Sequence, residues 1–331
     1  MGLEKRVADV FTDEIMKTAF QQFSIQKEMQ KLGDFENYVY EVVKNKQSYI
    51  LRLTHSSHRS QESICSELDW INYLHNCGMN VPKVYETVKG KLVAAIRARD
   101  GSYFFGSLFS KAPGSPVKVN DENFSKKLFY QWGSTIGKIH SATKEYHRGE
   151  GVKERLHWNE DELLAIERYI PKEEELVISN AKKLIANIER LERTADQYGL
   201  IHSDLHQGNF FYDGKDIHVF DFDDCCFHWF CSDIAIPIYY ATLFRYPDNK
   251  KGERDAFASI FLESFIAGYT TENNLPDDWI KQVLLFLRLR DVTLYSVFHK
   301  KIATEDRSER VKALLKEIRA RIERNEPLIK L

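Results

Sequence analysis

Hydrophobic and polar residues follow a strand-like pattern in the first third of the chain. Segments 37–43 (NYVYEVV) and 48–54 (SYILRLT) are rich in Tyr, Val and Ile, and KNKQ between them predicts a hairpin turn. Apolar residues at helical intervals predict one helix in 59–78, before a glycine and a proline. Further strands are expected in 84–98 and 101–110. This part of the chain therefore predicts strands around one main helix.

The pattern changes to a helical one after the Pro/Gly-rich stretch KAPGSP, where we place a domain boundary. The exception is a pair of short strands around Asp213-Gly214, a favourable tight-turn dipeptide. Helices are expected in 128–143, about 173–196, 257–269, 279–300 and 310–323. We therefore predict an α+β chain, with a small β-rich part followed by a larger, mostly helical one.

Length and charge narrow the class of protein. The 331 residues suffice for one large or two modest domains. A formal net charge of −2 argues against a nucleic-acid-binding surface. No apolar run approaches the roughly 18 residues of a membrane helix, and the start lacks the apolar stretch of a signal peptide. We expect a cytoplasmic protein with neither nucleic acid nor membrane as a partner.

The five cysteines are odd in number and lack CxxC spacing, so reduced thiols are expected. One cluster, CCFHWFC, brings together Cys225, Cys226, His228 and Cys231. Such soft ligands could hold zinc or copper. However, adjacent cysteines project in different directions and the flanking aromatic residues are typical of a core. We favour the core interpretation and leave the metal open.

The stretch LIHSDLHQGNFFYDGKDIHVFDFDD carries the candidate chemistry. Asp204 and Asn209 stand in a D-x-x-x-x-N arrangement, which offers a carboxylate to an acceptor hydroxyl and an amide oxygen to Mg²⁺. Asp221 follows a short strand, where a hard oxygen ligand can complete a metal site. Because the chain turns at Asp213-Gly214 and returns, we expect Asn209 and Asp221 at the same end of a two-stranded ribbon.

With its preceding glycine, this stretch resembles the signature of the aminoglycoside phosphotransferase and choline kinase-like family. The resemblance covers roughly residues 25–300. It implies a bilobal protein-kinase-like fold, with an N-lobe at 1–111 and a C-lobe at 112–331. It also implies ATP and Mg²⁺ as cofactors, and a nucleotide and a small-molecule acceptor as partners.

The resemblance assigns roles within the signature. It implies that Asp204 is the catalytic base, that Asn209 and Asp221 bind the metal, and that His202 braces the loop. Asp233 in CSDIAIP matches a family aspartate that braces the catalytic loop from below.

Two details of this stretch differ from the family pattern or stay open. Ser203 stands where the family usually has glycine, and because serine does not readily adopt positive φ, we expect a different local geometry without loss of catalysis. Asp223 and Asp224 could join the metal site or cap the next turn.

The N-terminal part is similar to the family's nucleotide-binding lobe. Arg52 in YILRLT would hold the α- and β-phosphates, and Glu67 would hold Arg52, with Glu62 as the alternative. We expect this pair to be partly exposed, so that Glu67→Gln leaves folding nearly intact. LGDFENYVY resembles the nucleotide-covering loop, with Gly33 and Asn37 at matching positions.

The segment GSLFSKAPG resembles the family's interlobe hinge, whose backbone groups contact the adenine edge. Placing Gly114 on the family's hinge glycine makes the carbonyl of Ser110 the expected acceptor and the N–H of Ala112 the expected donor.

The predicted function is transfer of the ATP γ-phosphoryl group to a hydroxyl of an amino alcohol, amino acid, sugar or aminoglycoside. The alternatives are a Ser/Thr protein kinase of the stress-response kinase type and a non-catalytic nucleotide-binding scaffold. Asp204, Asn209 and Asp221 together argue against the scaffold.

The C-terminal helices should contact the acceptor, although aromatic and arginine side chains there more often belong to core and surface. Two arginines beside the single Asp291 favour an anionic or zwitterionic acceptor. The candidate acceptor-binding residues are Trp229, Tyr239, Arg288, Arg290 and Tyr295.

Overall fold

The computed structural model describes residues 5–34, 36–247 and 250–331. Its contacts divide the chain into two compact units. The first unit comprises Met1–Pro113, Tyr146–Arg155 and His218–Asp223, and the second comprises Gly114–Glu145, Leu156–Ile217 and Asp224–Leu331. Two short later segments of the chain thus belong to the first unit.

The first unit is built on an antiparallel sheet with the strand order β1-β2-β3-β6-β4, to which β5 adds by pairing with β6. The predicted hairpin joins β2 to β3, and both turn residues, Asn45 and Lys46, have positive φ, as a type I′ turn requires. The strands are β1 (Lys27–Gly33), β2 (Asn37–Lys44), β3 (Gln47–His55), β4 (Val84–Tyr85), β5 (Ala94–Arg97) and β6 (Tyr103–Ser110).

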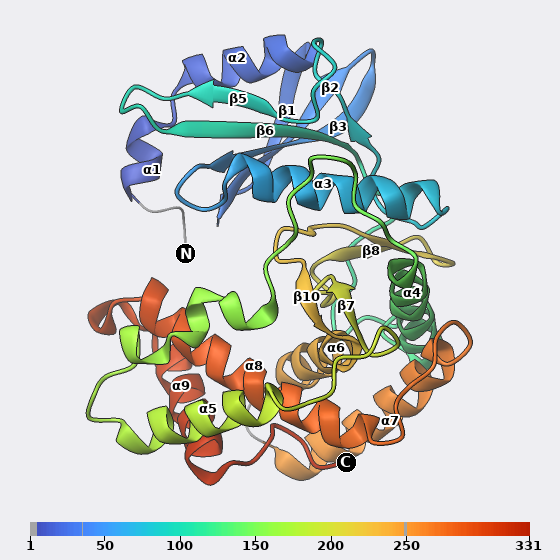
Figure 1. Ribbon diagram of the computed structural model, residues 1–331, viewed down its shortest axis with the longest axis vertical. Helices are drawn as coiled ribbons and strands as arrows, with labels where there is room; N and C mark the ends of the chain where they lie inside the picture. The colour runs from blue at the N-terminus through green and yellow to red at the C-terminus, as the bar shows by residue number, and fades with distance from the viewer. Residues whose placement is uncertain (1–4, 35, 248–249) are drawn as a thin grey trace. The chain divides into compact units, whose positions relative to one another are not determined.

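Helices cover both faces of this sheet. Figure 1 shows α2 (Asp13–Phe23) and α3 (Gln61–Asn76) on opposite faces. The buried residues of α2 pack with the sheet, as does part of α1 (Lys5–Val10). Sequence analysis predicted α3 and missed the two shorter helices. The single strand expected in 84–98 is two strands, because the chain turns between them at Gly90, which has a φ of 68°.

The second unit is mostly helical, as predicted. Its α5 is shorter than expected because the chain leaves the helix after Ile188 in a tight turn, in which Leu191 N–H donates to the Ile188 carbonyl. Its α6 was not predicted; it is apolar on nearly all sides and contains Pro237. The helices are α4 (Lys126–Lys144), α5 (Glu175–Ile188), α6 (Phe230–Arg245), α7 (Lys251–Tyr269), α8 (Trp279–Lys301) and α9 (Glu309–Arg324). Short 3₁₀ turns are η1 (Trp158–Glu160), η2 (Glu162–Leu164), η3 (Ile166–Arg168) and η4 (Thr304–Asp306).

Two short strand pairs frame the signature segment. β7 (Tyr198–Ile201) pairs with β10 (Cys226–Trp229), and β8 (Phe210–Tyr212) pairs with β9 (Ile217–Val219). The predicted turn between β8 and β9 is present: Gly214 has a φ of 94°, and Asp213 Oδ1 accepts from the N–H groups of Lys215 and Asp216 at 2.9 and 2.7 Å. The loop between β7 and β8 carries the first half of the predicted catalytic motif.

None of the helices in the described ranges is both long and apolar enough to cross a membrane.

Glycines allow α4 and α7 to pack with their backbones almost in contact. A Cβ added at Gly133 would lie 1.8 Å from the carbonyl oxygen of Phe265, and one at Gly268 would lie 1.9 Å from that of Tyr130. Because the obstructing atoms are backbone atoms, no side-chain rotation can make room. The two helices must separate if either glycine gains a side chain.

We predict that Gly133→Ala lowers the free energy of unfolding by about 3 kcal/mol, a value at the upper end for overpacking. Denaturant unfolding of the purified variant measures this loss. The matched control is Gly252→Ala in the first turn of α7, where an added Cβ meets nothing within 4 Å. Equal stability of the two variants would contradict the close packing of α4 and α7.

Candidate active site

The loop between β7 and β8 is fixed by a buried aspartate. Asp233 in α6 is 1% exposed, and its two carboxylate oxygens accept from the backbone N–H groups of His202 and Ser203 at 3.0 and 2.7 Å. It also contacts His140 Nε2 at 3.2 Å. The predicted bracing role of Asp233 is confirmed. His202 is fully buried, and its Nδ1 accepts a long hydrogen bond of 3.4 Å from the Asp204 backbone N–H. This side chain therefore supports the loop from the interior of the protein.

Ser203 adopts a φ of 70°, in the left-handed region. Our expectation of a different local geometry at this position was wrong, since serine takes up the type of conformation that glycine adopts without strain. The hydrogen bond from its N–H to Asp233 helps to hold this conformation. Asp221 also has a positive φ, of 66°.

We predict that Ser203→Gly raises the free energy of unfolding by up to about 1 kcal/mol, because it relieves left-handed strain at some cost in unfolded-state entropy. Thermal and denaturant unfolding measure the change. A clear loss of stability would mean that the Ser203 side chain makes a stabilising interaction that outweighs the strain.

Asp204 lies in this loop with its carboxylate held from two sides. Its Oδ1 is 2.7 Å from Arg290 Nη2, and its Oδ2 is 3.4 Å from His206 Nε2. Burial raises the pKa of the Asp204 carboxyl, but the charges of Arg290 and His206 lower it by more, so the pKa lies below its ordinary value. The side chain thus stays a carboxylate at neutral pH, as a group that orients and accepts a proton must.

Asn209 is oriented by the same loop. Its Nδ2 donates to the backbone carbonyl of Asp204 at 2.9 Å, with the Asp204 carboxylate 3.3 Å away. This assignment of the amide follows from the hydrogen-bond network. The Asn209 Oδ1 therefore points away from Asp204, and it makes no hydrogen bond within the described ranges. A hard cation such as Mg²⁺ fits an oxygen of this kind.

Arg290 in α8 contacts Asp204, and Tyr240 in α6 holds Arg290 in place. The Tyr240 hydroxyl accepts from Arg290 Nε at 3.0 Å and also from Nη2, and the guanidinium lies 5.0 Å from the centre of the Tyr240 ring. The His206 ring packs against the same ring, with 4.9 Å between their centres. Sequence analysis named Arg290 but missed Tyr240 and His206. His206 lies inside the quoted motif, two residues after Asp204, which was a usable signal.

The other proposed acceptor residues lie in different surroundings. Trp229 and Tyr239 have no exposed surface; Trp229 Nε1 donates to the carbonyl of Glu192, and the Tyr239 hydroxyl donates to Asp291. Tyr295 is 3% exposed and donates to Glu174 at 2.7 Å. These three residues have packing roles, and we leave them out of the proposed site.

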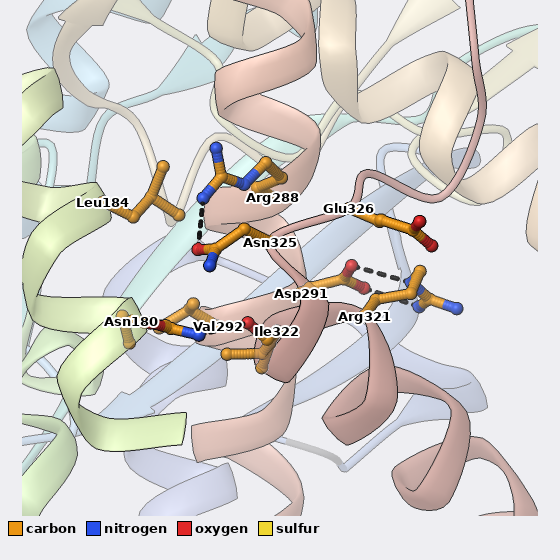
Figure 2. A pocket seen from close by; sticks show the side chains of 10 residues that line it. Asn180, Leu184, Arg288, Asp291, Val292, Arg321, Ile322, Asn325 and Glu326 are labelled. Carbon is orange, nitrogen blue, oxygen red and sulfur yellow. Dashed lines mark hydrogen bonds and ion pairs between the residues drawn. The ribbon is translucent and has the colours of Figure 1, made fainter. Parts of the chain in front are cut away.

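Arg288 reaches the end of α9, as Figure 2 shows, where its Nη2 donates to Asn325 Oδ1 at 2.8 Å. Asp291 is instead paired with Arg321, through two bonds of 2.6 and 2.8 Å. The two arginines expected beside Asp291 therefore do not form an anion site, and this argument for an anionic acceptor no longer holds.

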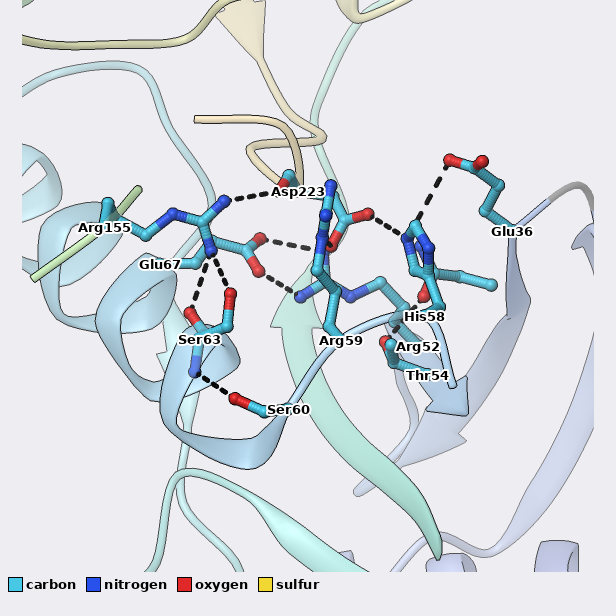
Figure 3. Close-up of polar contacts among 11 residues, drawn as sticks. Glu36, Arg52, Thr54, His58, Arg59, Ser60, Ser63, Glu67, Arg155 and Asp223 are labelled. Carbon is cyan, nitrogen blue, oxygen red and sulfur yellow. Dashed lines mark hydrogen bonds and ion pairs between the residues drawn. The ribbon is translucent and has the colours of Figure 1, made fainter. Parts of the chain in front are cut away.

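In the first unit, Arg52 and Glu67 form the ion pair that the resemblance implied. Arg52 Nη1 and Nη2 donate to the two Glu67 oxygens at 2.8 and 2.6 Å (Figure 3). The side chains are only 7% and 1% exposed, so the expectation of a partly exposed pair was wrong. Burial lowers the pKa of Arg52, but Glu67 raises it above its ordinary value. Arg52 Nε is buried and has no hydrogen bond in the described part, which leaves one donor for a further anion.

We predict that Glu67→Gln lowers the free energy of unfolding by about 3 kcal/mol, because it leaves the buried Arg52 charge uncompensated. Denaturant unfolding measures this loss. The control is Glu62→Gln, at an exposed position in the first turn of the same helix, which should unfold like the wild type. Equal stability of Glu67→Gln and the wild type would show that the charge of Glu67 does not stabilise the fold through Arg52.

Asp223 belongs to the same polar network of the first unit (Figure 3). It is buried, with His58 Nε2 2.6 Å from its Oδ2 and Arg59 Nε 3.5 Å from its Oδ1. Arg155 donates to its backbone carbonyl at 2.7 Å. Burial raises the pKa of the Asp223 carboxyl, but His58 and the charges of Arg59 and Arg52 lower it far more, to well below its usual range. Asp223 therefore serves as a buried anion that joins loops of this unit.

Two clusters could be considered for metals in addition to the predicted site. Glu36, His58 and Asp223 offer ligand atoms within 4.8 Å of one another. However, Arg59 already contacts Asp223, and its charge disfavours a cation there. In the cysteine cluster, Cys225 and Cys231 are buried, and burial lowers the pKa of His228 to about 3. This pattern supports the core interpretation.

The remaining predicted nucleotide-binding positions all lie in the first unit. Asn37 is the first residue of β2, and its Oδ1 accepts from the Thr54 hydroxyl at 2.6 Å. Gly33 is the last residue of β1. Phe35 of the expected nucleotide-covering loop lies outside the described residues. At the expected hinge, the Ser110 N–H donates to the Lys83 carbonyl at 2.9 Å. Within the described ranges, the Ala112 N–H donates to no backbone carbonyl.

Gly114 is the residue on which the hinge assignment depends, and it lies in the second unit. Its φ is 90°, and an added Cβ would lie 2.7 Å from the Tyr212 backbone, so a side chain does not fit there.

Comparison with known proteins agrees with this geometry. The family model described as the phosphotransferase enzyme family matches residues 29–270. Amicoumacin kinase from Bacillus subtilis (strain 168) is 34% identical over 330 residues, which cover 99% of this chain and 97% of that protein.

Solved structures give the same result. A structure of an amicoumacin kinase in complex with AMP-PNP, Ca²⁺ and Ami superimposes with a TM-score of 0.93 at 34% identity, covering 99% of this chain and 98% of that one. A microcompartment-associated aminopropanol kinase matches with a TM-score of 0.77 at 23% identity, covering 95% and 97%. At that identity, the second similarity shows the fold alone.

Proposed function

The chain belongs to the phosphotransferase enzyme family and is a small-molecule kinase with a hydroxyl acceptor, and we propose that it transfers the γ-phosphoryl group of ATP in the presence of Mg²⁺. Its fold is the protein-kinase-like fold of that family. The observation that carries the proposal is Asp204, an ionised carboxylate on a loop that Asp233 fixes.

The proposed roles divide between the two units. In the first, Arg52 would hold the α- and β-phosphates with Glu67 behind it, and Asp221 would supply a metal ligand. In the second, Asn209 would supply a metal ligand through its Oδ1, and Asp204 would orient the acceptor hydroxyl and accept its proton. Bound Mg²⁺ would neutralise charge on the triphosphate. Catalysis would then be mainly positioning and electrostatics.

The remaining proposed contacts concern the nucleotide base and the covering loop. The carbonyl of Ser110 and the N–H of Ala112 would contact the adenine edge, and Gly33 and Asn37 would belong to the loop over the phosphates. The Ala112 N–H, which has no backbone partner in the described part, supports this assignment.

We propose a hydroxylated small molecule of the amicoumacin or amino alcohol kind as the acceptor. Amicoumacin kinase, similar over nearly the whole chain, supports a small molecule over a protein hydroxyl. The same similarity, with Asp204 and Asn209 both present on the loop and bonded to each other, supports an enzyme over a scaffold. The first measurement is therefore ADP release with ATP and Mg²⁺ over a panel of amino alcohols, sugars, aminoglycosides and amicoumacin.

We predict that Asp204→Asn lowers phosphoryl transfer by a factor of about 10² or more, because the variant keeps the shape of the side chain but loses the proton acceptor. Binding of Mg-ATP should barely change. Thermal melting measures that binding, since a ligand at about 100 times its dissociation constant adds about 2.7 kcal/mol to the stability.

The matched control is Asp216→Asn in the β8–β9 turn, which should transfer like the wild type. Wild-type transfer by Asp204→Asn would overturn the catalytic role. A wild-type protein whose melting temperature does not respond to millimolar Mg-ATP would count against the whole proposal.

A further inference from the structure

The segment Tyr146–Arg155 belongs to the first unit and is bonded to α3 near both of its ends. At its start, the Tyr146 hydroxyl donates to Asp69 Oδ2 at 2.6 Å. At its end, Arg155 Nη1 donates to the hydroxyl and to the carbonyl of Ser63, at 2.7 and 3.0 Å. Ser63 and Asp69 lie about 9 Å apart along the helix axis. The segment therefore holds more than one turn of α3.

Arg155 also bonds to the chain that follows β9. Its Nη2 donates to the backbone carbonyl of Asp223 at 2.7 Å, as Figure 3 shows. The residue is only 7% exposed. Because the guanidinium is planar and rigid, it holds the carbonyls of Ser63 and Asp223 at one separation. Both of these oxygens belong to the backbone, so the contact fixes the main chain of both elements.

The first of these elements, α3, carries Glu67. This residue lies between the two attached positions, Ser63 and Asp69, and forms the buried ion pair with Arg52. The placement of α3 therefore determines where the guanidinium of Arg52 is held.

The second element carries Asp221, and the chain is attached on either side of it. Two residues later, the carbonyl of Asp223 accepts from Arg155. Two residues earlier, the Val219 N–H donates to the Asn80 carbonyl at 2.9 Å. Asp221 has a φ of 66°, and a non-glycine residue keeps such a conformation only where its surroundings fix it. Loss of the Arg155 contact would allow this stretch of chain to relax.

The side chains that these two elements place lie near each other. Burial lowers the pKa of Arg52, and its carboxylate neighbours, Asp221 among them, raise it above its ordinary value. Arg52 and Asp221 are therefore close enough for their charges to interact, as two groups that contact one Mg-ATP would be.

We propose that Arg155 is a positioning residue for Mg-ATP. By fixing α3 to the backbone of Asp223, it sets the placement of Arg52 relative to Asp221. This inference rests on the proposed function, since it takes Arg52 as a phosphate ligand and Asp221 as a metal ligand. Arg155 acts through these elements and not by contact with the nucleotide.

The test compares the affinity for Mg-ATP of the wild type and of Arg155→Met, which keeps an apolar stem but removes the guanidinium. Isothermal titration calorimetry is done well below the melting temperature of each variant, where nearly all of the protein is folded. We expect the Kd of Arg155→Met to be at least about tenfold higher than that of the wild type, which corresponds to about 1.4 kcal/mol. A residue that only stabilised the fold would change the melting temperature and leave this Kd unchanged.

Arg155→Lys keeps the charge and a donor without the fork, so it should recover part of the affinity that Arg155→Met loses. It replaces Arg155→Met if that variant does not fold, with an expected rise in Kd of at least about threefold. The first control is Arg148→Met, which removes an exposed arginine from the same segment and should bind like the wild type. The second is Gly133→Ala, between α4 and α7, which should lose stability without a change in Kd.

A smaller rise in the Kd of the folded variant would overturn the inference. An equal rise in Gly133→Ala would also overturn it, because the loss of affinity would then follow from stability alone. The wild-type titration separates this failure from failure of the proposed function. If the wild type binds Mg-ATP and the Arg155 variants bind it equally well, only the role of Arg155 falls. If the wild type binds no Mg-ATP, the proposed function falls as well.

Discussion

The catalytic loop depends on the pair of hydrogen bonds that Asp233 accepts from two consecutive backbone amides. A carboxylate that is 1% exposed needs strong donors, and the amides of His202 and Ser203 supply them. Both oxygens are used, so the peptide cannot rotate without leaving a buried charge unpaired. This constraint sets the direction in which the chain leaves β7, and hence the position of Asp204.

The same constraint explains how serine is accommodated where the family usually has glycine. Left-handed φ at a non-glycine residue costs about 1–2 kcal/mol. A hydrogen bond to a charged group contributes about 1.5–3 kcal/mol, so the bond from the Ser203 amide to Asp233 offsets the strain. The family glycine is thus a favourable choice for this position, and the loop shape does not require it.

Much of the fold and part of the site could be predicted from the sequence. The β2–β3 hairpin, α3 and the turn at Asp213-Gly214 follow from local patterns, because their residues favour one local conformation. α6 could not be found in the same way, since it is apolar on nearly all sides and carries an internal proline. Because α6 is apolar on nearly all sides, its sequence does not indicate which of its residues lies near Asp204. Tyr239 bonds to the buried Asp291, whereas Tyr240 packs against His206 and bonds to Arg290, yet the two tyrosines are adjacent in the sequence.

Arg288 and Arg290 show the same limit on α8. Two residues along a helix correspond to about 200° of rotation, so side chains at these positions point in nearly opposite directions. Both residues are arginines, so their type does not distinguish them. Only their partners on α6 and α9 determine which of them lies beside the Asp204 carboxylate. One arginine bonds to Asn325 at the end of α9, and the other is held by Tyr240 against Asp204. Of the two arginines predicted from the sequence to act together, only Arg290 therefore lies beside the Asp204 carboxylate, in an orientation set by Tyr240.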